Sequence, residues 1–98
     1  MNVELRNEAR NDLDEGAWFY ERQNTGLGDY FLDCVDSDLA TLEKCSGLHE
    51  TVFGFQRKLM TRFPFAIYYR IGANYVDVVA ILDCRRNPDY LETRLRNS

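Results

Sequence analysis

The residues best suited to chemistry in this sequence are basic and aromatic, and they gather in its second half. No acidic residue occurs from position 51 to 76, whereas that segment carries four bases: Arg57, Lys58, Arg62 and Arg70. A second basic pair, Arg85-Arg86, is followed closely by Tyr90. Guanidinium groups bind phosphates and carboxylates, and Arg and Tyr are also typical anchors of protein interfaces. The second half therefore predicts the surface that meets a partner.

The charge distribution supports this division of the chain. The net charge is −4, but residues 1–50 hold 12 acids and 4 bases (4 − 12 = −8), and residues 51–98 hold 4 acids and 8 bases (8 − 4 = +4). A molecule with one acidic and one basic half can present a local positive field despite its negative total. The acidic total argues against direct DNA binding, so we expect none.

Length and composition predict one ordinary globular domain over residues 1–98. The chain has 98 residues, 45% of them hydrophobic, which is enough for one modest core. The longest purely apolar stretch, Val78–Leu82, is far shorter than the ~20 residues that cross a bilayer. The N-terminus lacks the apolar region of a secretory signal. We therefore expect a cytoplasmic protein that does not enter a membrane.

The cysteines and the histidine predict neither a metal nor a cofactor. Cys34, Cys45 and Cys84 are odd in number, and no two form a CxxC pair, so we expect reduced thiols. His49 is the sole histidine and follows a polar break in the pattern. We expect it to be exposed to solvent and not catalytic.

Two amphipathic helices are expected in the first half. Apolar residues recur at helical spacing over about 8–23, with Trp18 and Phe19 expected to pack in the core and Asp12 on the polar face. Asn24-Thr25-Gly26 interrupts the pattern, and a second apolar stripe continues to about residue 45. Residues 8–45 therefore predict an antiparallel helical hairpin that must cover an apolar surface.

Strands are expected on both sides of this hairpin. Residues 1–6 alternate as a short strand does, and residues 53–83 predict three more strands, with turns near 61–62 and 72–74. Within them, alternation places Tyr69 in the core and Tyr68 on the other face, as a candidate for exposed contact. The tail, 84–98, allows a short helix after Pro88. The expected fold is α+β, in the order β-α-α-β-β-β, with the hairpin on one face of a small antiparallel sheet.

Three motifs in this order resemble the RelE/ParE toxin superfamily. Residues 62–71, RFPFAIYYRI, resemble the family's "RFPYxIYYRI" strand, and 85–88, RRNP, resemble its "RR(D/N)P" segment. The spacing of Ala9, Asp12-Leu13, Tyr20, Gln23 and Gly26-Leu27 is similar to the family's "A..DL…Y..Q..GL" helix signature. The similarity runs from about residue 5 to 88 and is nearer to ParE-like than to RelE-like members.

The resemblance implies a toxin of a type II toxin–antitoxin (plasmid stabilisation) system, neutralised by a cognate antitoxin. RelE-like members cut mRNA in the ribosomal A site, whereas ParE-like members inhibit DNA gyrase and are not known to be enzymes. Fold alone does not decide between these activities. An inactive protein with the toxin fold, or one with a different target, also remains open.

The RelE-like alternative implies a metal-independent endoribonuclease that acts on the ribosome. Its candidate residues here are Arg57, Lys58, Arg85, Arg86 and Tyr90. Two departures weigh against it: Ala66 stands where ribosome-cutting members often carry an arginine, and Asp83 where many relatives have a histidine.

The ParE-like alternative requires a protein-binding surface instead of an acid–base pair. The candidate contact residues for gyrase or another partner are Arg62, Tyr68, Arg70, Arg85, Arg86 and Tyr90. We therefore expect a growth-inhibiting toxin that acts on gyrase and is not an enzyme.

Overall fold

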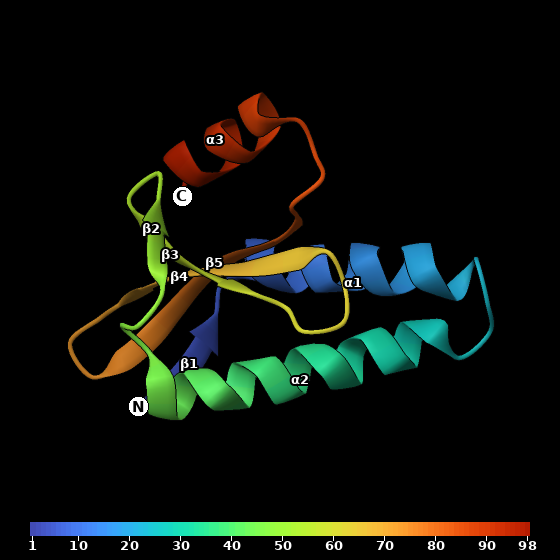
Figure 1. Ribbon diagram of the computed structural model, residues 1–98, viewed down its shortest axis with the longest axis horizontal. Coiled ribbons are helices and arrows are strands. Elements are labelled where there is room, and N and C mark those ends of the chain that lie inside the picture. The colour runs from blue at the N-terminus through green and yellow to red at the C-terminus, as the bar shows by residue number, and fades with distance from the viewer.

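The computed structural model describes residues 1–98 as three helices and five strands (Figure 1). In chain order the elements are β1 (Asn2–Leu5), α1 (Asn7–Glu21), α2 (Leu27–Cys45), β2 (Glu50–Val52), β3 (Phe55–Leu59), β4 (Phe65–Ile71), β5 (Tyr75–Asp83) and α3 (Pro88–Arg96). This is the α+β class that the sequence predicts. None of the three helices combines the length and apolar character that a membrane crossing would need.

The α1–α2 hairpin is closed by a single carboxylate. Glu21 at the end of α1 accepts hydrogen bonds from the backbone N–H of Gly26 (3.0 and 3.1 Å) and of Gly28 (3.0 Å). It thereby satisfies free donors at the start of α2, where negative charge is favourable. Gly28 also lets the helices approach closely, since a Cβ there would lie 2.6 Å from the Ala17 carbonyl oxygen. The hairpin is therefore defined by local chemistry, as its sequence pattern indicates.

The sheet has the strand order β1-β5-β4-β3-β2. The pairs β2–β3, β3–β4 and β4–β5 are antiparallel, but β1 pairs with β5 in parallel, so the sheet is mixed where an antiparallel one was expected. The chain returns from β1 through both helices and three strands, which brings β5 beside β1 in the same direction. The short strand β2 adds an edge that was not predicted, and Phe53, expected within a strand, lies in the turn after it.

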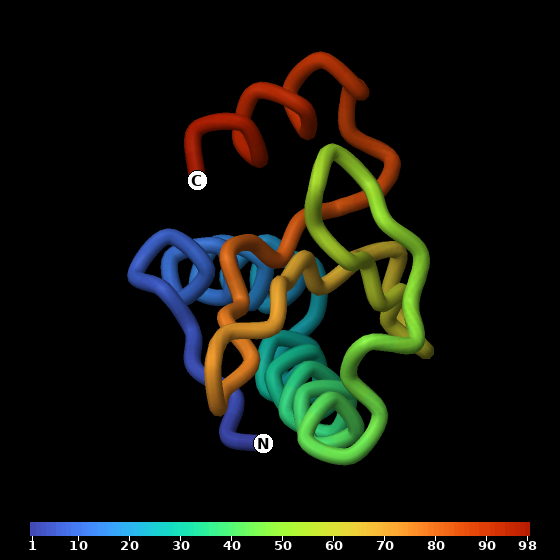
Figure 2. Tube along the Cα trace, turned by 90° about the vertical axis from the view of Figure 1, so that its left-hand side faces the viewer, coloured from blue at the N-terminus to red at the C-terminus, as the bar shows by residue number.

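Both faces of the sheet are covered. The α1–α2 hairpin packs on one face over the larger core, which includes Phe31, Phe65, Ile67 and Tyr69. On the other face α3 inserts Leu91 and Leu95 over a second core. Figure 2 shows α3 and α2 on opposite sides of the strands. The sheet therefore has no open face, a feature that alternation along the strands does not reveal.

Candidate partner-binding site

A groove of about 670 Å³ runs between α1 and the tail that follows β5. Its floor includes Phe65, Ile81 and Leu82 from the sheet. Clefts with an apolar floor and a few polar groups are the usual form of a binding site. Two of the predicted contact residues, Arg86 and Tyr90, lie in its wall. We name this feature the α1–tail groove.

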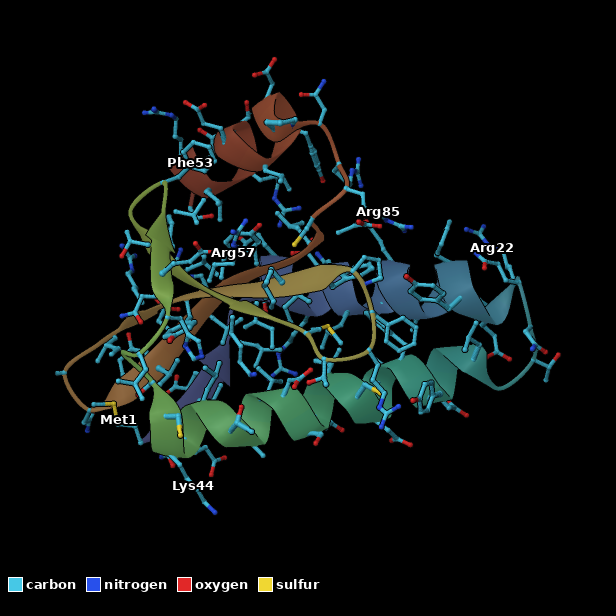
Figure 3. The ribbon with its side chains drawn as sticks, viewed as in Figure 1. Met1, Arg22, Lys44, Phe53, Arg57 and Arg85 are labelled. Carbon is cyan, nitrogen blue, oxygen red and sulfur yellow. The ribbon has the colours of Figure 1, made fainter.

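The tail beside the groove contains two adjacent arginines, Arg85 and Arg86, of which only Arg85 is paired with a carboxylate. The Arg86 guanidinium stacks over the Tyr90 ring, 3.8 Å from its centroid, and forms no ion pair. Arg85 instead donates two side-chain hydrogen bonds to Asp83, of 3.1 and 2.8 Å. The side-chain bond from Arg85 lowers the pKa of Asp83 below its ordinary value. Of the predicted pair, Arg86 is therefore the cation available to a partner. Figure 3 shows Arg85 where the chain leaves β5.

The opposite wall presents two aromatic side chains that were expected to be buried. Trp18 is 66% exposed and Phe19 46% exposed, and both line the groove together with Arg22. The buried face of α1 is instead formed by Ala9, Asp12, Gly16 and Tyr20, and a Cβ at Gly16 would lie 2.9 Å from the Phe31 ring. Large exposed aromatics beside a groove are typical of protein interfaces. Sequence reasoning missed them because hydrophobicity alone assigns aromatic residues to a core.

Asp12 joins the two walls of the groove. It was expected on the polar face of α1, but it is only 6% exposed. Its carboxylate accepts two hydrogen bonds from Arg94 of α3, of 2.9 and 2.8 Å, and a third from the Ile81 backbone N–H at 3.1 Å. These bonds raise the pKa of Arg94 above its ordinary value. The ion pair fixes the distance between α1 and α3 and so the width of the groove.

The two cations of β3 point to opposite faces of the sheet and lie outside the lining of the groove. Arg57 lies across from Tyr68 on the face that α3 covers, and it is paired with the Glu50 carboxylate. Lys58 lies across from Ile67 on the hairpin face, with its Nζ 3.7 Å from Asp38 Oδ1. The structure therefore does not bring Arg57 and Lys58 together with Arg86 and Tyr90 as one nuclease site.

The remaining predicted contact residues are dispersed. Arg62 is exposed in the turn before β4, and Arg70 lies near the other end of that strand, 3.4 Å from Asp77 and 5.5 Å from the centre of the Phe55 ring. The expectation that Tyr68 is an exposed contact is wrong. Tyr68 is fully buried beneath α3, because that helix covers the face on which Tyr68 lies.

His49 takes part in a partly buried hydrogen-bond network and is only partly exposed, whereas exposure to solvent was expected. Its Nδ1 lies 2.5 Å from the Tyr69 hydroxyl, which donates to Gln56 Oε1 (3.0 Å) and accepts from the Gly47 backbone N–H (3.3 Å). The network is complete when Nδ1 carries the imidazole proton. Burial, with a smaller effect of Lys58, lowers the pKa of His49. Through the Tyr69 hydroxyl, Gly47 and His49 connect the segment between α2 and β2 to the sheet.

Comparisons with known proteins identify the fold. No family model and no curated protein matches the sequence. Among solved structures, the chain is similar to one described as the chromosomal ParDE toxin–antitoxin system from P. aeruginosa. The TM-score is 0.71 at 18% sequence identity, over 83% of this chain and 92% of that one. The chain thus has the RelE/ParE-like fold that its three motifs predict.

Proposed function

We propose that this chain is the toxin of a type II toxin–antitoxin pair, neutralised by a cognate antitoxin, and that it acts by binding DNA gyrase. The observation that carries the proposal is the α1–tail groove. Its exposed Trp18 and Phe19, its apolar floor and its unpaired Arg86 form a surface suited to a protein segment.

We assign the groove to the antitoxin. The α1 wall presents an acidic, an aromatic and a basic side chain on successive helical turns: Glu15, Trp18 and Arg22. A complementary segment presents a basic, a large apolar and an acidic side chain in that order, over about 10 Å. Neither Glu15 nor Arg22 forms an ion pair within the chain, so both are available to such a segment.

Inhibition of gyrase by binding is supported over RNA cleavage by the placement of the cations. Cleavage needs a base, an acid and phosphate-binding cations around one phosphate. Here Arg57 is paired with Glu50, Lys58 lies on the other face of the sheet, and Arg85 is paired with Asp83. A binding mechanism needs no such constellation.

Two assays test the two parts of the proposal. The antitoxin part is tested by titrating the purified chain with the product of the neighbouring small gene. We expect a complex of submicromolar Kd that Trp18→Ala weakens about 100-fold, as loss of a central aromatic anchor does. The matched control is Leu48→Ala, another exposed apolar side chain (79%) that lies outside the groove. Equal affinity of all three chains would assign the antitoxin to another surface.

The gyrase part is tested with purified gyrase and relaxed plasmid. We expect supercoiling to fall as the chain is added and to recover when the antitoxin is added. Supercoiling that is unchanged at a large molar excess of the chain would overturn gyrase as the target. Cleavage of mRNA on translating ribosomes would in that case support the RelE-like alternative.

A further inference from the structure

The turn between β2 and β3 holds an aromatic residue in an unfavourable conformation. Phe53 has φ +51° and Gly54 φ +85°, so both central residues of this two-residue hairpin turn have positive φ. Such type I′ turns strongly prefer Asn-Gly, Asp-Gly or Gly-Gly, because a side chain with a Cβ is strained there. Phe53 is the one residue of the chain other than glycine with positive φ.

Neither core of the protein accounts for this choice of residue. The Phe53 ring is 42% exposed and belongs to neither core, whereas Phe55, two residues later, is 7% exposed and packs under α3. The ring also forms none of the aromatic pairs seen among the other aromatic side chains. Strained backbone conformations of this kind cluster at functional positions.

The tip of this hairpin projects on the same side of the sheet as α3, as Figures 1 and 2 both show, and Figure 3 shows Phe53 at the tip. At the base of the tip the Arg70 guanidinium lies over the Phe55 ring, with its side chain 52% exposed. Because Arg70 is engaged with Phe55 and Asp77, the exposed group that this tip offers to a partner is the Phe53 ring, and phenylalanine is among the residues enriched in protein interfaces.

We propose that Phe53 is an anchor with which the toxin engages its protein target, its ring entering an apolar pocket of that protein. This inference rests on the proposed function and adds a second surface, separate from the α1–tail groove. A protein is favoured over a nucleic acid because the two arginines at the base of the hairpin are already paired within the chain, Arg57 with Glu50 and Arg70 with Asp77. Neither is left free to bind a phosphate backbone.

The test compares three variants with the wild-type chain, each induced without the neighbouring gene and at matched protein levels. Phe53→Asn removes the ring and supplies the residue that the turn prefers. Phe53→Trp keeps an aromatic ring, and Leu48→Asn is the matched control at another exposed apolar position. We expect Phe53→Asn to melt about 3–5 °C above the wild type, since a favourable turn residue relieves the strain. We expect it to need about tenfold more protein to arrest growth, with the other two variants close to wild type.

Each outcome decides a separate point. Phe53→Asn that is as toxic as the wild type would overturn this inference and leave the proposed function standing. If the wild-type chain does not arrest growth, the proposed function is wrong, and the inference that Phe53 contacts a target is wrong with it. Growth arrest by mRNA cleavage that Phe53→Asn abolishes would show that the ring stacks on a nucleic acid, and the protein target would be wrong.

Discussion

Asp12 and Arg94 lie 82 residues apart in the sequence, and their side chains form a two-bond ion pair of 2.9 and 2.8 Å. The same carboxylate accepts a hydrogen bond from the Ile81 backbone N–H. Ile81 lies in the part of β5 beyond Val78, where the pairing with β1 has ended. One buried side chain therefore links α1, the central sheet and α3. It also connects the two walls of the α1–tail groove.

Removal of the Asp12 carboxylate should destabilise the fold more than any other acidic substitution on α1. Asp12→Ala leaves Arg94 and the Ile81 N–H without their acceptor, and we expect a loss of about 3 kcal/mol in the free energy of unfolding. Urea unfolding measures it. The matched control is Asp14→Ala, on the same helix but exposed and unpaired, with an expected change below about 0.5 kcal/mol. Equal effects of the two substitutions would show that the ion pair does not hold α3.

The adjacent tyrosines of β4 should respond to the same substitution with opposite sign. The Tyr68 hydroxyl is fully buried beside Arg57 and Cys84, but neither side chain meets it with the geometry of a full hydrogen bond. Tyr68→Phe removes this unsatisfied group, so we expect stabilisation by about 1 kcal/mol. Tyr69→Phe removes a hydroxyl that contacts Gly47, His49 and Gln56, so we expect a loss of about 2 kcal/mol. Thermal unfolding of both variants decides it, and destabilisation by Tyr68→Phe would contradict the assignment.

The stability of the wild-type chain should depend on His49 in mildly acidic solution. The pKa of His49 is lowered in the folded state, so below the ordinary value of 6.5 the unfolded chain binds a proton that the folded chain resists. The contribution of His49 is complete above that value and declines as the pH falls through the lowered pKa. We expect the urea concentration at the midpoint of unfolding to decrease when the pH is lowered from 7.5 to 5. This decrease should be smaller in His49→Gln than in the wild type. Identical pH profiles of the two chains would mean that His49 titrates as it does in water.

Arg85 and Arg86 should differ in their effect on antitoxin binding, although they are neighbours of the same type. Arg86 faces the groove without a carboxylate partner, so Arg86→Ala should weaken the complex about tenfold. Arg85 is bound to Asp83 and does not line the groove, so Arg85→Ala should change the Kd less than about twofold. Isothermal titration calorimetry measures both. The reverse order would place the partner on the outer side of the tail.

The helical hairpin and the strands of the second half are predictable because their signals are local. Apolar periodicity marks α1, α2, β4 and β5, and the motif around residues 62–71 predicts the fold that the structural comparison shows. Strand β2 gave no such signal, since Glu50-Thr51-Val52 is short and mostly polar. The parallel pairing of β1 with β5 depends on the whole path of the chain and on no residue of β1 itself.

The candidate site was predicted less completely, for two physical reasons. Alternation placed Tyr68 and Tyr69 on opposite faces correctly, but it could not show that α3 covers the second face. Asp12 was assigned to solvent because its ion-pair partner is remote in sequence. The same reasoning explains Trp18, whose exposure depends on how α1 is rotated over Phe31 and Phe65. Local patterns indicate which residues are apolar or charged, whereas their neighbours are set by the tertiary fold.

The most direct test of the central claim is a pulse label of thymidine and methionine in bacteria, minutes after the chain is induced without its neighbouring gene. A toxin that acts on gyrase predicts that thymidine incorporation falls first while methionine incorporation continues, and that co-expression of the antitoxin restores both. Methionine incorporation that falls first would contradict the claim and identify translation as the target.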